Sequence, residues 1–593
     1  MAALFTTPKR NDTTAGTHVA EPDVRRRIGL AHGSWRRVTR RIVAGAVCAL
    51  TVSSLLMPSV SLAAEWVKVG GNKYNTAASD EAGTWSWDGA DDLKLNNYNG
   101  GEIQAAGKLN VNYSGTNIVT AEWIESIKVS HGTNENAELN IQGDEGGTLS
   151  VTSTEDAILS TGNINIDGAG SVNATSTGFD AINAGGDLAI KGSGNVNATG
   201  ASDGIRANGN ITIDNSGAVT ARATEDQGIV AGRNLTIKGG GTVEASPIKD
   251  VSIWAGGNID ISGGSQVEAS SKETLAVDAE GSLAVTNASL DASGVEYGVY
   301  AYKGVTLDHA TVTVRTSASG GQAIALITDG DDIVIKNGSI VDALAEGEVS
   351  AAFSTRNDRP NEKGGHIYIS DSVVKAIARY VENGDGPIPY SENQDGETRR
   401  EPQGENIGII AQTSEGVTPA VISIIRSKVT AEGDTAAIFA RAMSVDGKTI
   451  GTIKIENAAI QTPEGGKVID YRKLRDGIYE AGQAIGTGDA TVDSLYIKAV
   501  AKSTTIAPPE VAKPEDPKPD ETNPAESKPA ESKQNPKPEG SKSTKAVAAS
   551  TTKAKTTGVL AATGDTSGAA IVATVLAGTA TIAAGTMASR KRS

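Results

Sequence analysis

Cysteine and large aromatic side chains are nearly missing from this chain. Its 593 residues include one cysteine, Cys48, and 4% aromatic residues, whereas glycine occurs 69 times. A single cysteine excludes an intramolecular disulfide framework, so stability must come from packing. So few large side chains cannot fill the core of an ordinary globule, and the composition favours a thin core of small and branched residues.

Positive charge and histidine are also scarce. The formal net charge is −17, with 54 lysine and arginine residues against 71 aspartate and glutamate residues. An acidic surface repels phosphate backbones and polyanionic glycans, so we expect no nucleic-acid partner. The 5 histidines stand apart without the spacing of metal ligands, and we expect neither a metal nor another cofactor.

Between residues 164 and 305 the chain repeats itself. Successive units begin with an apolar residue at intervals of 22 to 24 residues, namely Ile164, Leu188, Ile211, Leu235, Ile259, Leu283 and Val305. Each unit holds three short alternating segments separated by turn-forming residues, as in 210–213, 218–221 and 228–231. Three strands per unit of about 24 residues predict an all-β fold, a right-handed parallel β-helix solenoid in which each unit forms one turn, or rung.

The pattern within each rung predicts which side chains face inward. Paired residues of the first and second strands should point into the core, because a shift of one residue would expose them all. First-strand pairs such as Ile211/Ile213 are large, and second-strand pairs such as Val219/Ala221 combine a larger and a smaller residue. Asparagines recur just before the first strand, and we interpret them as structural residues whose amides bond from rung to rung: Asn163, Asn210, Asn234 and Asn258.

The N-terminal residues have the order of an export signal. Residues 36–41 are rich in arginine, residues 42–56 are apolar, and Ser61-Leu62-Ala63 offers the small residues that a signal peptidase reads. We therefore expect residues 1–64 to be a signal peptide with a long amino-terminal region, cleaved after Ala63 or Ala64. The arginines also fit a twin-arginine signal, but general secretion is the simpler interpretation.

Residues 558–593 combine a short motif, an apolar run and a basic end. The motif Leu560-Ala561-Ala562-Thr563-Gly564 precedes an uncharged apolar segment over residues 568–588, and Arg590-Lys591-Arg592 follows it. The apolar segment has the ~20 residues that a transmembrane helix requires. The basic end is expected to stay in the cytoplasm.

This order resembles a sortase sorting signal, in the variant with alanine at the second position that is common in high-GC Gram-positive bacteria. The resemblance implies that a sortase cleaves between Thr563 and Gly564 and transfers the chain to peptidoglycan, after the helix has held it in the membrane. The alternative is an ordinary C-terminal membrane anchor. The preceding residues 503–557 are rich in proline, lysine and glutamate, which predicts a disordered, extended stalk.

These signals divide the chain into six predicted parts. They are the signal peptide (1–64), the N-terminal cap with the first rungs (65–137), the regular rungs (138–330), the irregular rungs with a C-terminal cap (331–502), the stalk (503–557) and the sorting signal (558–593). The irregular part contains two long polar loops, over residues 355–364 and 382–405.

One outward-facing column of side chains could contact a ligand. Alignment of the third strands places Arg206, Val230, Trp254, Asp278 and Tyr300 in this column. Trp254 and Tyr300 would then lie two rungs, or roughly 10 Å, apart. Aromatic faces at this spacing can stack on alternate sugar rings, so the candidate glycan strip consists of Arg206, Trp254, Asp278, Tyr300 and the nearby Tyr302. Scattered exposed aromatics without a ligand are the alternative.

A second aromatic group opens the predicted mature chain. It comprises Trp66, the stretch Trp85-Ser86-Trp87-Asp88 and the stretch Leu93-Lys94-Leu95-Asn96. This opening resembles that of bacterial surface proteins described as containing a carbohydrate-binding domain, and the resemblance, which covers about residues 66–310, implies a sugar ligand. Alternatively, these tryptophans cap the open end of the β-helix and shield its backbone edges.

Pectin-lyase-like β-helices include lyases and polygalacturonases, which raises the question of catalysis. Residues 330–336 resemble part of the polygalacturonase pattern, and residues 365–367 and 426–428 follow in matching order. The resemblance implies a candidate catalytic set of Asp331, Asp332, His366, Arg426 and Lys428. The glycine that should follow the histidine motif and a third aspartate motif are missing, so we expect no enzymatic activity.

The sequence therefore predicts a secreted, wall-anchored protein that displays a non-catalytic β-helix. Binding of glycans, or adhesion to host or neighbouring cells, is the first interpretation of its role. A structural surface spacer without a specific ligand is the second, and a polygalacturonase-like hydrolase is the third.

Overall fold

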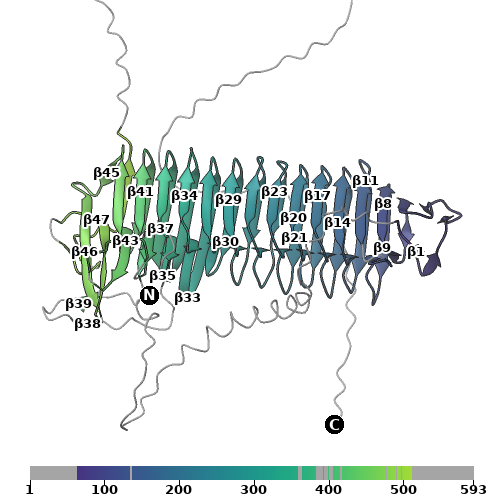
Figure 1. The fold of residues 1–593 in the computed structure, drawn as a ribbon, viewed down its shortest axis with the longest axis horizontal. Coiled ribbons are helices and arrows are strands. Elements are labelled where there is room, and N and C mark those ends of the chain that lie inside the picture. The colour runs from purple at the N-terminus through teal and green to yellow at the C-terminus, as the bar shows by residue number, and fades with distance from the viewer. Residues whose placement is uncertain are drawn as a thin grey trace, which may run out of the picture. The chain divides into compact units, whose positions relative to one another are not determined.

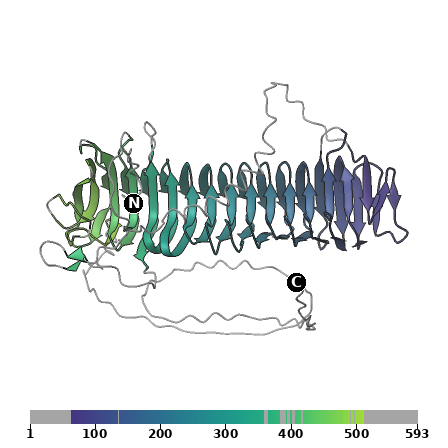
Figure 2. The same cartoon turned by 90° about the horizontal axis from the view of Figure 1, so that it is seen from below.

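The computed structural model describes residues 63–509 except 134–136, 358–363, 382–390, 393–397, 400–404, 415–416, 446, 476, 489–490 and 496. Within these residues the chain is all-β and contains no helix. Most strands pair in parallel within two long sheets of 16 and 30 strands, as predicted for a stacked parallel β-helix. Figures 1 and 2 show the rungs lying side by side.

Each regular rung contributes one strand to the smaller sheet, here called sheet A, and two strands to the larger sheet, sheet B. Sheet A consists of β3 (Ala78–Ser79), β4 (Trp85–Trp87), β5 (Asp92–Asn96), β8 (Lys108–Ser114), β11 (Glu138–Gly143), β14 (Asn163–Gly168), β17 (Leu188–Gly192), β20 (Ile211–Asn215), β23 (Leu235–Lys238), β26 (Ile259–Ser262), β29 (Ser282–Thr286), β32 (Gly304–Asp308), β34 (Ile333–Lys336), β36 (Ile367–Ser370), β41 (Val421–Ile425) and β44 (Thr452–Glu456).

The second and third strands of the regular rungs belong to sheet B. The second strands are β6 (Asn99–Gly100), β9 (Thr116–Ala121), β12 (Thr148–Ser153), β15 (Ser171–Ser176), β18 (Val196–Gly200), β21 (Ala218–Ala223), β24 (Thr242–Ala245), β27 (Gln266–Ser270) and β30 (Ser289–Gly294). The third strands are β7 (Ile103–Ala106), β10 (Ile127–Ser130), β13 (Ile158–Ser160), β16 (Ile182–Ala184), β19 (Ile205–Ala207), β22 (Ile229–Ala231), β25 (Ile253–Ala255), β28 (Val277–Ala279) and β31 (Tyr297–Ala301).

The predicted register of the core is confirmed. Ile211 of β20 pairs with Leu235 of β23, and Val219 of β21 pairs with Val243 of β24, so equivalent residues stack in columns. All of these side chains are at most 3% exposed. Burying one isoleucine or leucine contributes about 1.5–3 kcal/mol, and a one-residue slip would forfeit that contribution in every rung. The alternating pattern therefore determines the register.

The rungs become irregular beyond β32. First-strand residues Val305, Ile333, Ile367, Ile422 and Ile453 still stack, but they are 28, 34, 55 and 31 residues apart. Sheet B continues here through β33 (Thr311–Asp329), β35 (Ile340–Asn357), β37 (Val373–Tyr380), β40 (Asn406–Thr413), β42 (Lys428–Gly433) and β43 (Ala436–Ser444), of which β33 and β35 are much longer than the strands of the regular rungs. Of the predicted loops, 355–364 and 382–405 lie largely outside the described residues, and a short antiparallel pair, β38 (Ser391–Glu392) with β39 (Thr398–Arg399), belongs to the second.

Antiparallel hairpins close the N-terminal end. In sheet B, β1 (Trp66–Val69) runs antiparallel to both β2 (Asn72–Tyr74) and β7. In sheet A, β4 runs antiparallel to β3 and β5. Trp85 and Trp87 are 7% and 2% exposed, and the Trp85 ring lies 5.2 Å from that of Tyr74. The burial of these tryptophans supports their interpretation as a cap.

Antiparallel strands also cover the last rungs. β47 (Ile478–Gly486) pairs antiparallel with β43 and with β46 (Lys467–Arg475), while β48 (Ser503–Ala507) pairs antiparallel with β42 and β45 (Ala459–Thr462). Arg441 on β43 lies opposite Gly482 of β47. Its Nη1 binds Glu405 Oε2 at 3.1 Å and Glu480 Oε1 at 2.5 Å, and its Nη2 binds Gln412 Oε1 at 2.6 Å. These contacts tie the hairpin to the rungs.

Several predicted segments lie outside the described residues. They are the signal peptide up to residue 62, most of the stalk, the sorting motif Leu560–Gly564 and the apolar segment 568–588. At the expected signal cleavage site, Ala63 forms a bridge with Lys108 and Ala64 is buried. In the part of the chain that the structure describes, no helix could cross a membrane.

Candidate functional site

The predicted strip residues occupy one column of sheet B. Arg206, Val230, Trp254, Asp278 and Tyr300 lie opposite one another on β19, β22, β25, β28 and β31. Trp254 and Tyr300 are therefore two rungs apart. The expectation of a continuous external strip is wrong, however, because Val230 and Asp278 are 1% and 3% exposed. Asp278 lies between the two large rings of the neighbouring rungs, which shield it from solvent.

Contacts within the protein hold Tyr300. Its hydroxyl donates to Asp329 Oδ2 at 3.3 Å, and its ring centroid lies 5.9 Å from that of Tyr297. Both tyrosines pack against an apolar cluster on the outer face of sheet B that includes Ile324 and Ile327. Tyr302, in the turn after β31, is half-buried. Tyr300 thus belongs to the packing of the irregular rungs as much as to any external surface.

The two charged strip residues have different surroundings. Arg206 Nη1 donates to Asp203 Oδ2 at 2.8 Å, so its charge is neutralised locally. Burial, together with the negative charges of Glu280 and Asp250, raises the pKa of Asp278 to about 7. Among the described residues, Asp278 Oδ1 has no hydrogen-bond partner. With this pKa the carboxyl is only partly ionised at neutral pH, and its burial leaves it poorly placed to meet a ligand.

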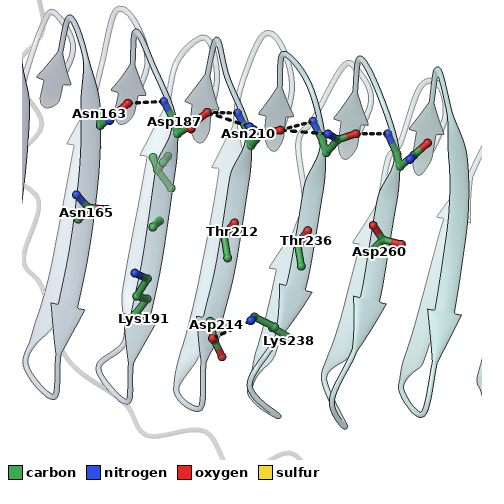
Figure 3. A pocket seen from close by; sticks show the side chains of 14 residues that line it. Asn163, Asn165, Asp187, Lys191, Asn210, Thr212, Asp214, Thr236, Lys238 and Asp260 are labelled. Atoms are coloured by element: carbon green, nitrogen blue, oxygen red, sulfur yellow. Dashed lines mark hydrogen bonds and ion pairs between the residues drawn. The ribbon is translucent and has the colours of Figure 1, made fainter. Parts of the chain in front are cut away.

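The outer face of sheet A forms a long polar groove. Its volume is about 760 Å³, and it crosses β14, β17, β20, β23 and β26. Figure 3 shows its lining, which consists of Asn163, Asn165, Asp187, Leu188, Ala189, Lys191, Asn210, Thr212, Asp214, Asn234, Thr236, Lys238, Asn258 and Asp260. Apart from Leu188, which belongs to the core, these are the positions that alternate with the buried core pairs. The side chains of each strand alternate between the two faces of the sheet, and the small residues that point outward leave a depression in the outer face. The groove is this depression.

A ladder of side-chain amides and carboxylates forms one wall of the groove. Asn163 Oδ1 accepts the backbone N–H of Asp187 at 2.9 Å, and Asp187 Oδ1 accepts that of Asn210 at 2.7 Å. Asn210 Oδ1 and Asn234 Oδ1 accept the N–H groups of Asn234 and Asn258 at 3.2 and 2.9 Å, and Asn258 Oδ1 extends the pattern to Ser282 at 3.0 Å. The structural role predicted for the asparagines is confirmed (Figure 3).

The rest of the groove floor is mixed in charge. Thr212 and Thr236 stack on neighbouring rungs, and Asp214 pairs with Lys238 at 3.2 Å. Lys191 lies beside Asp214 in the register. The sequence pattern placed these residues outward, but it did not indicate that five successive rungs would share small or flexible side chains on the same face. That signal becomes visible only when the outward positions are aligned rung by rung.

The candidate catalytic residues separate into two places. Asp332 Oδ1 accepts the backbone N–H of His366 at 2.9 Å, and His366 Nδ1 accepts the N–H of Val421 at 3.1 Å. Burial lowers the pKa of His366. Asp331 is adjacent, and its carbonyl accepts the hydroxyl of Thr328 at 2.6 Å. These polar groups therefore serve the backbone of the turn that precedes β36.

Arg426 and Lys428 lie at the opposite end of the same strands. Arg426 binds Asp371 through two hydrogen bonds of 2.7 Å, and Lys428 begins β42. Since His366 precedes β36 and Asp371 follows it, the two groups are about 16 Å apart at the usual rise per strand residue. The five residues do not converge on one groove, so they supply no site for inverting hydrolysis.

A cluster of three aspartates near the N-terminal cap has the type of ligand atoms that bind a cation. Asp88, Asp91 and Asp92 bring carboxylate oxygens within 4.8 Å of one another. Asp88 Oδ1 already accepts the backbone N–H groups of Ala90 and Asp92 at 2.8 and 3.1 Å. The proximity of these aspartates is thereby explained by the turn, whose backbone Asp88 stabilises.

Comparison with known proteins does not identify a family for this chain. No protein-family model, no curated protein and no solved structure matches the chain.

Proposed function

We propose that this chain is an exported, wall-anchored surface protein whose right-handed β-helix binds extended glycans without cleaving them. The arginine-rich residues 36–41 and the apolar residues 42–56 support export, and the motif Leu560–Gly564 supports anchoring. In this route, residues 568–588 hold the chain in the membrane until a sortase links Thr563 to peptidoglycan. The stalk over residues 503–557 then carries the β-helix away from the wall.

The groove on sheet A is the observation that carries the glycan-binding part of the proposal. It is long and open, it crosses five rungs, and hydroxyl, amide and charged groups recur in it at the rung spacing of ~4.8 Å. A chain of sugars offers hydroxyl groups at a similar repeat. A polymer lying along the groove would therefore meet equivalent hydrogen-bonding groups at each step.

The charges in the groove favour a neutral polymer. Asp187, Asp214 and Asp260 face the groove together with Lys191 and Lys238. A uronic-acid or sulfated chain would meet these carboxylates in addition to an acidic protein surface. Because like charges at close range are unfavourable, such chains should bind more weakly.

A glycan array probed with the purified protein tests this function. Thr212→Arg fills the groove with a long side chain, and Thr220→Arg places the same side chain on sheet B of the same rung as a matched control. We expect Thr212→Arg to weaken glycan binding at least tenfold, or about 1.4 kcal/mol, and Thr220→Arg to leave it unchanged. Equal effects of the two variants would contradict the groove as the site.

Two further outcomes separate the alternatives. A wild-type protein that binds no glycan but is recovered covalently in the cell-wall fraction would indicate a spacer. Thr563→Ala should leave the protein in the membrane fraction, because the sortase acyl intermediate forms at this residue. Continued attachment of the variant to peptidoglycan would contradict the anchoring route.

A further inference from the structure

Among the described residues, the most exposed large apolar side chain lies in a loop that the sequence patterns did not single out. Trp123, between β9 and β10, is 80% exposed and has a φ of +66°. Left-handed backbone is unfavourable for a bulky residue, and an indole in water gains nothing from burial. A residue that opposes folding in two ways is a candidate for function.

Three hydrogen bonds to the next rung hold the loop of Trp123. Its backbone N–H donates to Thr154 Oγ1 at 2.8 Å, Ser126 Oγ donates to the carbonyl of Thr152 at 2.5 Å, and Ser153 Oγ donates to that of Ile124 at 2.8 Å. The strained conformation is thus imposed by its surroundings. The ring is presented to solvent from a fixed backbone.

A second exposed ring lies two rungs further along the same corner. The loop of Thr154 follows that of Trp123, and it is followed in turn by the loop of Phe179, since Thr177 N–H donates to the carbonyl of Ser153 at 3.0 Å. Phe179 is 43% exposed. Its backbone N–H donates to Ser176 Oγ at 3.0 Å, and its carbonyl accepts from Ala201 and Ser202. Two rungs place the two residues about 10 Å apart along the β-helix.

The surroundings of the two rings are polar and acidic. Glu122 and Glu125 flank Trp123, and Glu155 and Asp156 occupy the loop between the rings, while Lys128 pairs with Glu125 at 2.8 Å. In the loop beyond Phe179, the corresponding residue is Ser202. The patch is therefore two separate rings with carboxylates between them, which lacks the continuous apolar centre of a protein–protein interface.

We propose that Trp123 and Phe179 form a stacking platform for alternate sugar rings of a neutral, extended glycan. The spacing matches the repeat at which a straight β-linked chain presents the same face of its rings. Glu122, Glu155 and neighbouring carboxylates accept hydrogen bonds from sugar hydroxyl groups and repel anionic chains. This inference rests on the proposed glycan-binding function, but it concerns a different surface from the groove on sheet A.

Trp123→Gly gives the sharpest test, because binding and stability should change in opposite directions. Glycine adopts a positive φ without strain, so the melting temperature should rise by a few degrees. Binding of soluble oligosaccharides from cellulose, xylan or chitin, measured by calorimetry, should weaken about tenfold through loss of a ring contact. Trp123→Phe should retain most of the affinity. Polygalacturonate, as the anionic comparison, should bind more weakly than the neutral chains.

Two further variants separate this inference from the proposed function. Phe179→Ala should weaken binding as Trp123→Gly does, whereas Trp254→Ala, on the partly buried column, should not. If Thr212→Arg abolishes binding while Trp123→Gly and Phe179→Ala leave it unchanged, the platform is refuted and the groove remains. If the wild type binds none of these glycans, both proposals fail. A fall in melting temperature with Trp123→Gly would identify Trp123 as a structural residue and overturn the inference.

Discussion

Oδ1 of Asp180 accepts the backbone N–H of Asp203 at 3.0 Å, although both carboxyls are buried. The same contact occurs one rung earlier, where Asp156 Oδ1 accepts the N–H of Asp180 at 3.0 Å. Three carboxyls therefore stack at the corner of the β-helix, and Arg206 at Asp203 is the cation paired with them. Burial, together with the negative charges of the neighbouring Asp203 and Asp156, raises the pKa of Asp180 to about 8.

This stack predicts that stability falls as pH rises. A carboxyl whose pKa is raised in the folded state binds a proton on folding, so its contribution is complete below its unfolded pKa of about 4 and is lost as pH approaches 8. Asp180→Asn keeps the acceptor and removes the titration. We expect this variant to be more stable than wild type at pH 8, with little difference at pH 4, in urea unfolding. Asp260→Asn, an exposed control, should follow wild type. Parallel pH profiles for wild type and Asp180→Asn would contradict the assignment.

The amide ladder predicts a local loss of stability. Asn210 accepts through Oδ1 from the N–H of Asn234 and donates through its own N–H to Asp187. Asn210→Ala removes the side-chain acceptor and should lower the free energy of unfolding by about 1 kcal/mol. Thr212→Ala, two residues away on the same outer face, should cost much less. Equal losses in a denaturant titration would show that the ladder adds nothing.

The buried charge network at the C-terminal end predicts a larger effect. Arg441→Met leaves Glu480 buried without a cation, and we expect a loss of about 3–5 kcal/mol. Arg441→Met combined with Glu480→Met removes the two buried charges, leaves only the more exposed Glu405 without its cation, and should recover most of that loss. The comparison is made by urea unfolding of the two variants. A double variant no more stable than the single one would mean that packing, rather than charge, explains the effect.

The fold of the regular rungs was predictable because its cause is local and repeated. Residues such as Ile211 and Val219 occur at fixed positions in every unit, and each must be buried on the same face. The irregular rungs were harder to define, since 55 residues separate Ile367 from Ile422 although the two pair directly. Strand pairing across such an insertion leaves no periodic trace in the sequence.

The sequence predicted which residues of the candidate site align on successive rungs, but not which of them are exposed to solvent. Trp254, Asp278 and Tyr300 do align, yet the burial of Asp278 depends on the size of the side chains on adjacent rungs. Trp123 escaped notice for a related reason. Its loop belongs to a rung of unusual length, so alignment of the repeats does not place it. Its exposure depends on the hydrogen bond of its backbone to Thr154 and not on a sequence motif.

The antiparallel hairpins at the N-terminal end have a consequence for how long this protein can become. A bare first rung would offer parallel edges to the last rung of another copy, and the molecules could then join head to tail into fibres. At that end β1 and β4 fold the chain back, and the outermost strands β2 and β3 are only 3 and 2 residues long, which leaves little edge for such pairing. The number of rungs in one chain therefore sets the length of the β-helix. Inserting one more unit should extend it by about 4.8 Å without causing the molecules to polymerise.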